Sequence, residues 1–278
     1  MTDISPLISL VIGVLQGVFE WLPISSEGNI TLFLTAFTSL EPDAAVQLSL
    51  FLHAGTALSA TVYYREEVLE VLDDVKDTSN WRPSSAFEPR NAEAWFLGVA
   101  TFASVVTGLA AYSAIIEVAT EVTGGVFVAV IGLLLVITGV LQRVAESRDS
   151  YGSRDPNLTD SLLVGGLQGL AILPGVSRSG TTASALLLRG HDGSTSLRLS
   201  FLLSIPAAFG AGVLTVLETG GLPSVSPVSA VTAVSASAVV GYLTIDALMR
   251  VVERIAFWLV CVVLGLLAVV GGYLTLVL

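Results

Sequence analysis

The chain has 278 residues, of which 53% are hydrophobic and only 13% are charged, and its mean hydropathy is +0.82. This composition places it among polytopic membrane proteins. The net charge of −11 argues against nucleic acid as a partner and against a polybasic lipid-binding patch. Acidic loops are typical of proteins that work in high salt, so we expect the chain to come from a halophile.

The first apolar stretch, residues 4–22, ends in the polar turn Pro-Ile-Ser-Ser-Glu-Gly-Asn at residues 23–29. The apolar run that follows, residues 30–40, is too short to cross a bilayer, because a spanning helix needs about 20 residues. We therefore predict a re-entrant helical hairpin, which enters the membrane and returns to its starting side. Residues 1–20 lack the basic region and cleavage site of a signal peptide, so we expect them to belong to the folded protein.

Six spanning helices are predicted next, in two groups of three separated by a second short hairpin. That hairpin has apolar runs at 162–173 and 183–188 around the polar turn Pro-Gly-Val-Ser-Arg-Ser-Gly-Thr-Thr at 174–182. Within hydrocarbon, such a turn is stable only when it is buried in protein or lines a wet cavity. The predicted spans are 44–63, 94–116, 124–142, 196–217, 228–248 and 257–276.

The two halves of the chain resemble each other, which indicates an internal duplication. Residues 13–17 (Gly-Val-Leu-Gln-Gly) recur at 165–169 (Gly-Gly-Leu-Gln-Gly), and the Leu-Pro pair at 22–23 recurs at 173–174. We predict a single membrane domain that contains two such repeats. The domain covers residues 1–278, and the repeats cover about 4–142 and 159–276.

Each predicted repeat holds one hairpin, which returns to its starting side, and three spans, which do not. The second repeat is therefore inserted upside down relative to the first, and the two hairpins enter from opposite faces and meet near the midplane. The predicted fold class is an all-α polytopic membrane protein, an inverted repeat with six transmembrane helices and two re-entrant helical hairpins.

The basic residues predict the orientation of this fold. The linkers 117–123 and 218–227 and both termini hold no Lys or Arg. By the positive-inside rule, the other side is cytoplasmic and both termini are extracytoplasmic. Under the predicted topology, that cytoplasmic side holds Arg65, Lys76, Arg82, Arg90, Arg143, Arg148, Arg154, Arg189, Arg198, Arg250 and Arg254.

The second turn combines a guanidinium with several hydroxyl groups. An arginine at membrane depth is a candidate functional residue and implies an anionic ligand. Hydroxyls, a five-donor guanidinium and the free N–H groups of a helix start all suit a phosphate. The residues concerned are Ser177, Arg178, Ser179, Thr181 and Thr182.

The first turn and the segment before it supply carboxylates and further polar groups: Gln16, Glu20, Ser25, Ser26, Glu27 and Asn29. Two carboxylates that face one arginine suit phosphoryl chemistry, in which a cation stabilises phosphate oxygens and a carboxylate holds a metal ion or takes a proton. Two alternatives stay open. Glu20 and Glu27 could form a salt bridge to Arg178 that only joins the hairpins, and Gln16 and Gln168 could only make interhelical hydrogen bonds.

Two long motifs, in this order, carry a resemblance to a known family. Residues 16–26 (Gln-Gly-Val-Phe-Glu-Trp-Leu-Pro-Ile-Ser-Ser) and 174–181 (Pro-Gly-Val-Ser-Arg-Ser-Gly-Thr) closely resemble the undecaprenyl-diphosphatase family associated with bacitracin resistance. The resemblance implies hydrolysis of a C55-type polyprenyl diphosphate to the monophosphate, for recycling of a cell-envelope lipid carrier. It also implies a divalent cation, Mg2+ or Ca2+.

The resemblance places the family's Glu/Gln-x-x-x-Glu motif on Gln16 and Glu20 and its essential arginine on Arg178. We accordingly predict that Glu20 and Glu27 bind the metal ion. The predicted catalytic residues are Glu20, Ser26, Glu27 and Arg178, and the predicted substrate-binding residues are Gln16, Ser25, Asn29, Ser177, Ser179, Thr181 and Thr182.

The chain departs from the family pattern at one important position. The usual Ser-Ser-Thr-Gly-His is here Ser-Ser-Glu-Gly-Asn, so Asn29 replaces a histidine and can serve neither as general base nor as phosphohistidine. We expect Glu20 or Glu27 to take the proton, with Ser26 or a metal-bound water attacking. His53 could substitute, but a hydrogen-bonded packing role is the expectation, and His191 is given no role.

Two other functions compete with a phosphatase. Inverted repeats with broken helices are the architecture of many transporters, so a transporter or lipid flippase is the alternative. A degenerate family member that binds lipid phosphate without chemistry is a third candidate, because Asn29 replaces the histidine. The resemblance predicts that the polyprenyl diphosphate enters from the outer leaflet, and the sequence leaves open whether the chain forms a homodimer.

Overall fold

The computed structural model describes residues 4–76, 86–121, 124–147, 154–222, 225–252 and 255–277. Across these ranges all regular secondary structure is helical, in eleven helices. Three of the basic residues used to predict the orientation lie outside the described ranges: Arg82, Arg148 and Arg254.

Six of the helices in the described ranges are long and apolar enough to cross a membrane, which confirms the number of predicted spans. Each extends past its predicted apolar segment by one to several residues, since helix ends are the least certain part of a prediction from sequence. These helices are α3 (Pro42–Tyr63), α5 (Ala92–Glu121), α6 (Gly124–Glu146), α9 (Gly193–Glu218), α10 (Pro227–Val252) and α11 (Phe257–Val277).

Four short helices form two pairs, at the positions of the predicted hairpins. They are α1 (Pro6–Phe19), α2 (Ser26–Phe37), α7 (Leu158–Leu170) and α8 (Arg178–Leu188). The polar turns are shorter than predicted, since α2 and α8 begin inside them. The reason is N-capping: the hydroxyl oxygens of Ser25 and Ser177 accept hydrogen bonds from the N–H groups of Gly28 and Gly180.

The eleventh helix, α4 (Arg65–Lys76), lies in the connection between the predicted spans 44–63 and 94–116, where a loop and no helix was predicted. Its segment is rich in charge, which is why no apolar span was predicted there. Val68, Leu72 and Val75 nevertheless recur at helical spacing. The segment is therefore a polar surface helix.

The glycine repeat of the two halves has a direct structural role. Gly13 and Gly17 place α1 against α10, and Gly165 and Gly169 place α7 against α5. A Cβ atom at Gly169 would lie 2.6 Å from Gly108 N, so a side chain there would collide with the backbone. Small residues allow such close approach of helices in membranes.

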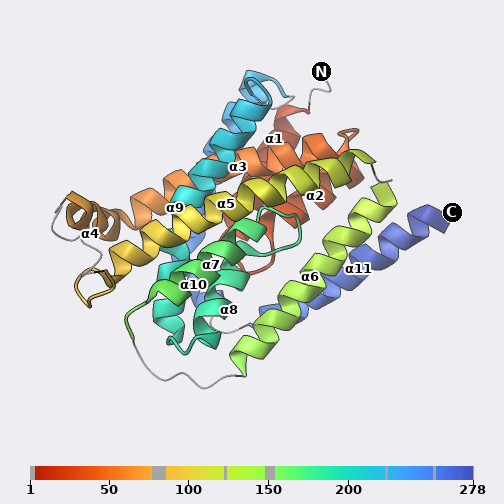
Figure 1. The fold of residues 1–278 in the computed structure, drawn as a ribbon. Coiled ribbons are helices and arrows are strands. Elements are labelled where there is room, and N and C mark those ends of the chain that lie inside the picture. Colours follow the sequence, from red (N-terminus) through yellow and green to blue (C-terminus); the bar gives the residue numbers. More distant parts are fainter. Residues whose placement is uncertain are drawn as a thin grey trace.

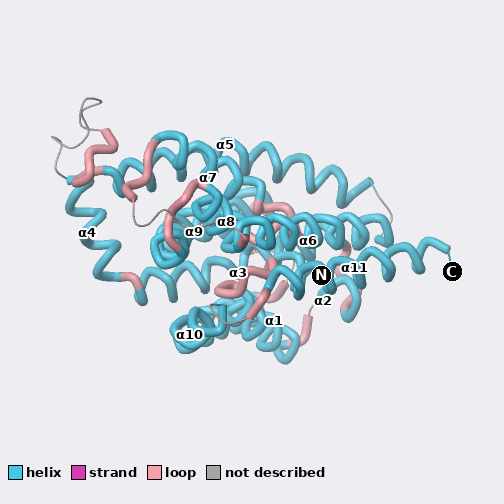
Figure 2. Tube along the Cα trace, turned by 90° about the horizontal axis from the view of Figure 1, so that it is seen from below, coloured by secondary structure: helices cyan, strands magenta, loops and turns pink. Residues whose placement is uncertain are grey.

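The packing follows the same plan in both halves. Figure 2 shows α1 and α10 at one edge, α5 and α7 at the opposite edge, and α3 and α9 between them. Helices α6 and α11 form a further pair along their whole lengths. The start of α1 and the end of α11 lie away from α4, at the opposite end of the molecule (Figure 1).

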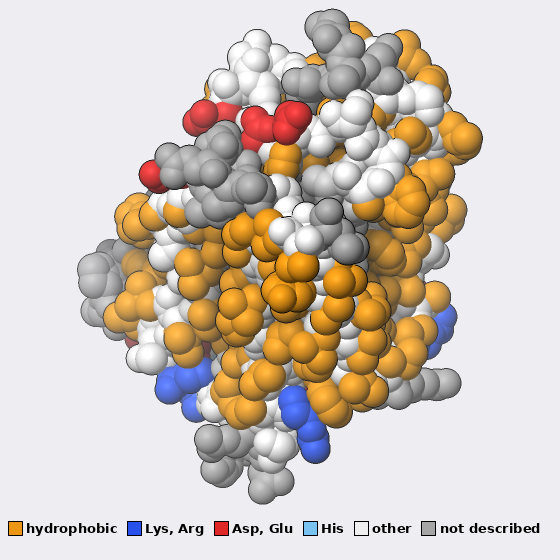
Figure 3. All heavy atoms as spheres, turned by 90° about the vertical axis from the view of Figure 1, so that its right-hand side faces the viewer, with side chains coloured by type: hydrophobic (Ala, Val, Ile, Leu, Met, Phe, Trp, Pro, Cys, Tyr) orange, Lys and Arg blue, Asp and Glu red, His pale blue; other side chains and the backbone are white. Residues whose placement is uncertain are grey.

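The outer surface carries a broad apolar region. Figure 3 shows hydrophobic side chains across the middle of one face, with acidic side chains toward the top and basic side chains toward the lower edges. Exposed residues such as Leu133 and Ile137 on α6 and Leu266 and Leu267 on α11 contribute to it. An apolar area of this extent is expected of a surface that faces lipid.

Asp160 ties the first turn of α7 to the residues that follow α8. Its fully buried carboxylate accepts from Arg189 Nε at 2.6 Å and from Asn157 N–H at 3.0 Å, and it lies 3.2 Å from His191 Nε2. Burial raises the pKa of Asp160, but hydrogen bonds from His191 and Arg189 outweigh it and hold this pKa well below its usual range. His191, given no role above, is therefore a buried structural residue.

Candidate active site

The turn after α1 and the turn before α8 lie in contact. Ser25 Oγ accepts a hydrogen bond from Gly175 N–H at 3.0 Å, and Ser179 Oγ donates to the carbonyl of Leu22 at 3.4 Å. A Cβ atom at Gly28 would lie 2.7 Å from Gly175 N, so this approach requires glycine. The contact brings the candidate residues of both turns into one cluster, as predicted.

Arg178 crosses this contact and forms a buried ion pair with Glu20. Only 11% and 3% of the two side chains are exposed. The guanidinium also lies 5.9 Å from the centre of the Phe201 ring on α9, within range of a cation–π interaction. Its Nη1 has no hydrogen-bond partner among the described residues, so the two N–H groups of this nitrogen are left for a ligand. The salt bridge left open by the sequence exists, and it involves Glu20.

Glu20 gathers several further partners around the same carboxylate. Gln16, one turn earlier, donates from Nε2 to Glu20 Oε2 at 2.9 Å, so the two side chains lie on the same helical face. Ser26 donates from Oγ to the same oxygen at 2.9 Å. Glu20 is therefore in direct contact with the hydroxyl that was predicted to attack or to position water.

His53, on α3, is the site residue whose position was not predicted. Its Nδ1 lies 2.9 Å from the carbonyl oxygen of Ser49, and because a carbonyl only accepts, Nδ1 carries the hydrogen. Its Nε2 lies 2.9 Å from Glu27 Oε1 and 3.2 Å from Glu20 Oε2. The histidine is hydrogen-bonded as expected. Its Nε2 attracts the two carboxylates when it also carries a hydrogen, so the cationic ring can pair with both of them.

Asn29 and Ser25 shape the first turn. Asn29 Nδ2 donates to the carbonyls of Ile24 and Ser25 at 2.7 and 2.8 Å, so both amide hydrogens are used within the turn. Ser25 has a φ of 60°, a conformation uncommon for residues other than glycine, and the caps and cross-turn bond described above hold it there. The structure thus gives both residues a positioning role.

The remaining candidates surround the start of α8. Thr182 Oγ1 lies 2.6 Å from Ser200 Oγ on α9 and donates to the Arg178 carbonyl, so it braces α8. Thr181 Oγ1 is buried with no partner among the described residues. Gln168 makes the interhelical hydrogen bonds left open above, to Ser104 Oγ at 3.0 Å and to the Leu203 carbonyl at 3.2 Å.

A cavity of about 10 Å3 lies among these side chains, lined by Glu20, Ser26, Glu27 and Arg178 with their neighbours. That volume is near the minimum for one water molecule. A phosphate therefore needs the Glu20–Arg178 pair to open. In the part of the chain that the structure describes, no group of three or more His, Cys, Asp and Glu side chains is arranged to hold a metal ion.

Comparison with known proteins agrees with this geometry. A family model described as bacitracin resistance protein BacA matches residues 9–270. A protein named undecaprenyl-diphosphatase from Haloarcula marismortui is 55% identical over 269 residues, which cover 96% of this chain and 97% of that protein. Proteins of the same name from Methanococcoides burtonii and Methanopyrus kandleri are 38% and 35% identical, and each alignment covers at least 95% of both chains. With its six candidate spans, the chain is a multi-pass membrane protein and belongs to the BacA bacitracin resistance family.

Proposed function

We propose that this protein hydrolyses a polyprenyl diphosphate to the monophosphate and inorganic phosphate. The observation that carries the proposal is the buried cluster in which Arg178 of one turn meets Glu20 and Ser26 of the other. Its relatives are named as diphosphatases, which favours this activity over the transporter or flippase considered above.

In this proposal the Glu20–Arg178 pair opens and Arg178 binds the nonbridging phosphate oxygens, with Nη1, which has no hydrogen-bond partner among the described residues, as a further donor. Ser26 lies within hydrogen-bond distance of Glu20, so Glu20 can take a proton from the Ser26 hydroxyl or from a water in its place. The net reaction adds the oxygen of water to the terminal phosphorus. The phosphoanhydride bond breaks, and the lipid monophosphate leaves with the bridging oxygen.

We also propose that Glu20 and Glu27 hold a divalent cation, Mg2+ or Ca2+. Carboxylate oxygens are the ligands these ions prefer, and Gln16 Oε1 is a further buried oxygen without a partner among the described residues. Mg2+ is commonly bound by one or two carboxylates together with substrate phosphates, so the small number of protein ligands suits it. A bound cation supplies positive charge to the phosphate oxygens.

For the membrane, we propose that the pairs α1–α2 and α7–α8 are re-entrant hairpins of an inverted repeat, with both termini extracytoplasmic. Their lengths of 14, 12, 13 and 11 residues support this, as does the matching glycine packing of α1 and α7. The lipid headgroup then reaches the cluster from the outer leaflet.

The test is phosphate release from a polyprenyl diphosphate by purified protein in detergent and molar KCl. We expect release that EDTA abolishes, and a loss of roughly 100-fold or more in Arg178→Ala and Glu20→Gln. Arg250→Ala is the matched control, because Arg250 is an exposed residue paired with Asp246. Folded wild-type protein that releases no phosphate with any divalent cation would refute the proposal and leave the degenerate binder.

A further inference from the structure

Arg178 has two partners of different kinds, a carboxylate and an aromatic ring. The first is Glu20, in the ion pair described above. The second is Phe201 on α9, which is 1% exposed; the guanidinium carbon lies over its ring, 5.9 Å from the centre. A cation over an aromatic face is attracted by the electrons of the ring, most strongly where water is excluded. Phe201 therefore stabilises the charge of Arg178 without carrying a charge itself.

The Phe201 ring is fixed in place by two further aromatic rings. The centre of the Trp21 ring lies 5.8 Å from it, and that of the Tyr64 ring lies 6.4 Å from it in a stacked arrangement. Trp21 is itself anchored, because its Nε1 donates to the carbonyl of Gly241 on α10 at 3.1 Å. These contacts hold the Phe201 ring over Arg178.

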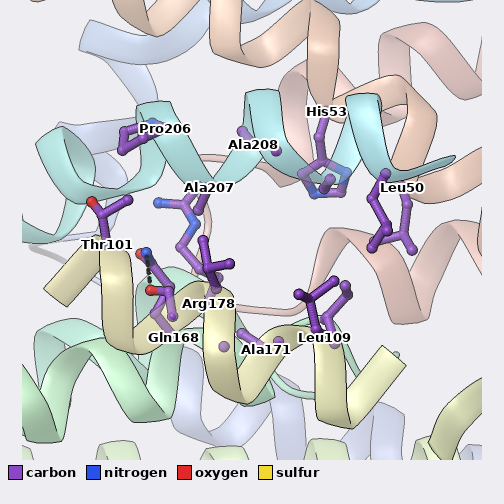
Figure 4. Close-up of a pocket in the computed structure, with 18 of the residues that line it drawn as sticks. Leu50, His53, Thr101, Leu109, Gln168, Ala171, Arg178, Pro206, Ala207 and Ala208 are labelled. Carbon is purple, nitrogen blue, oxygen red and sulfur yellow. Dashed lines mark hydrogen bonds between the residues drawn. The ribbon is translucent and has the colours of Figure 1, made fainter. Parts of the chain in front are cut away.

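Trp21 and Phe201 also separate Arg178 from a cavity of about 330 Å3. The two rings line the buried end of this cavity, and the exposed residues Glu146 and Ser194 line its outer end. Arg178 instead faces a different cavity, of about 210 Å3, which lies between α5 and α9 (Figure 4). The two aromatic rings therefore close the larger cavity off from the guanidinium.

The internal repeat supplies a comparison within the same chain. In the register of the repeated Leu-Pro pair, Thr182 and Ser200 correspond to Thr31 and Ser49. Both pairs of hydroxyl oxygens are within hydrogen-bond distance, at 2.6 Å for the first pair and 3.3 Å for the second. The two halves thus share the same contact between a short helix and a long one.

The residues next to this shared contact differ in a matched way. In the same register Glu27 corresponds to Arg178, and Leu50 corresponds to Phe201. The half with a cation in its turn has an aromatic ring on the long helix, whereas the half with a carboxylate has an aliphatic side chain. Because the face of a ring attracts a cation and repels an anion, this difference favours a cation–π role for Phe201.

We propose that Phe201 is a positioning residue for Arg178 in the hydrolysis, an inference that rests on the proposed function. Its ring holds the guanidinium at the cluster when the Glu20–Arg178 pair opens for a phosphate. Because the ring carries no net charge, it supports the guanidinium without repelling the phosphate. Glu20 moves away when the substrate binds, whereas Phe201 stays in contact with Arg178 throughout.

The sharpest test changes the electrons of the ring and leaves its size almost unchanged. Phenylalanines that carry one, two or three ring fluorines, placed at position 201, weaken the negative face of the ring step by step. We expect kcat/KM for a polyprenyl diphosphate to fall with each added fluorine, by roughly tenfold over the series. Phe201→Leu removes the ring and is expected to lose at least as much.

The matched control is the same fluorine series at Phe127 on α6. Phe127 is also fully buried, and it packs in an apolar cluster with Ile131 and Leu135. Fluorines at this position are expected to leave kcat/KM unchanged. A constant kcat/KM across the series at position 201 would overturn the proposal, as would an equal fall at both positions.

A binding measurement separates this proposal from the proposed function. A farnesyl diphosphate analogue with a methylene group in place of the oxygen between its phosphorus atoms cannot be hydrolysed there. We expect its dissociation constant to rise with each fluorine at position 201 and to stay constant across the series at position 127. Wild-type protein that binds the analogue but hydrolyses no polyprenyl diphosphate refutes the proposed function. The dissociation constants then still decide whether Phe201 positions Arg178.

Discussion

Glu20 and Glu27 place two buried carboxylates beside a single guanidinium. Glu20 is 5% exposed and Glu27 is 6% exposed, and both contact His53 Nε2. Buried charges are stable only when they are paired or hydrogen-bonded, so each neighbour of this cluster contributes to stabilising the two buried carboxylates. His53 is the neighbour that touches both, and its own position is set by the Ser49 carbonyl.

The role of His53 can be tested by two substitutions. We expect His53→Leu to lower the rate of phosphate release by roughly 10- to 100-fold, because it leaves both carboxylates without this partner. His53→Gln is expected to restore much of the rate, since its amide N–H can donate to one of them. The measurement is kcat for both variants. A fully active leucine variant would show that His53 only fills space.

At the residue scale, the sequence indicated which residues are candidates for the site better than it indicated which side chains they contact. Arg178 and Glu20 were found because charge at membrane depth is costly and therefore informative. His53 was underestimated, because its partners depend on how α3 lies against the first turn, and single-sequence spacing does not contain that distance. Asn29 was judged by the histidine it replaces, whereas its hydrogen bonds to the turn depend on the local backbone path.

Among the helices, α7 and α5 approach each other closely through the glycines of α7. Two adjacent glycines of α7 face different surroundings. A Cβ atom at Gly165 would lie 2.6 Å from Ala100 Cα, whereas a Cβ atom at Gly166 would have Thr107 Cγ2 at 4.0 Å as its nearest neighbour. The same substitution at these two positions therefore separates helix packing from helix propensity.

We expect Gly165→Ala to destabilise the protein by roughly 1–3 kcal/mol, because one methyl group forces α5 and α7 apart. Gly166→Ala is expected to be neutral or to stabilise by up to about 1 kcal/mol through helix propensity. Thermal unfolding in detergent, followed by tryptophan fluorescence, compares the two. Equal unfolding temperatures for both variants would contradict tight packing at this interface.

Six spans and two shorter pairs were predictable from run length alone, because membrane thickness sets how many apolar residues a span needs. The ends of the short helices were not. Residues 26–29 and 178–182 look like turns by composition, yet Ser25 and Ser177 cap helices that already include them. Helix α4 was missed for the opposite reason, since its charge concealed a helical spacing.

For the whole molecule, the predicted orientation in the membrane can be tested by cysteine labelling. Cys261 is fully buried, so the wild-type protein is expected to resist a membrane-impermeant maleimide. In right-side-out vesicles, Glu218→Cys at the end of α9 is expected to react directly. Asp73→Cys on α4, whose side chain is 74% exposed, is expected to react only after the membrane is opened. The reverse pattern would place both termini in the cytoplasm.

The ion pair between Arg178 and Glu20 has a consequence for how ligands come and go. A guanidinium held away from water is costly when it lacks an anion, and Glu20 supplies that anion in the structure. In the proposed reaction, binding is therefore an exchange, in which a phosphate replaces a carboxylate on the same arginine. Release is the reverse exchange. Glu20 therefore competes with the phosphate product for Arg178. This competition favours release of the product from an arginine that binds anions tightly.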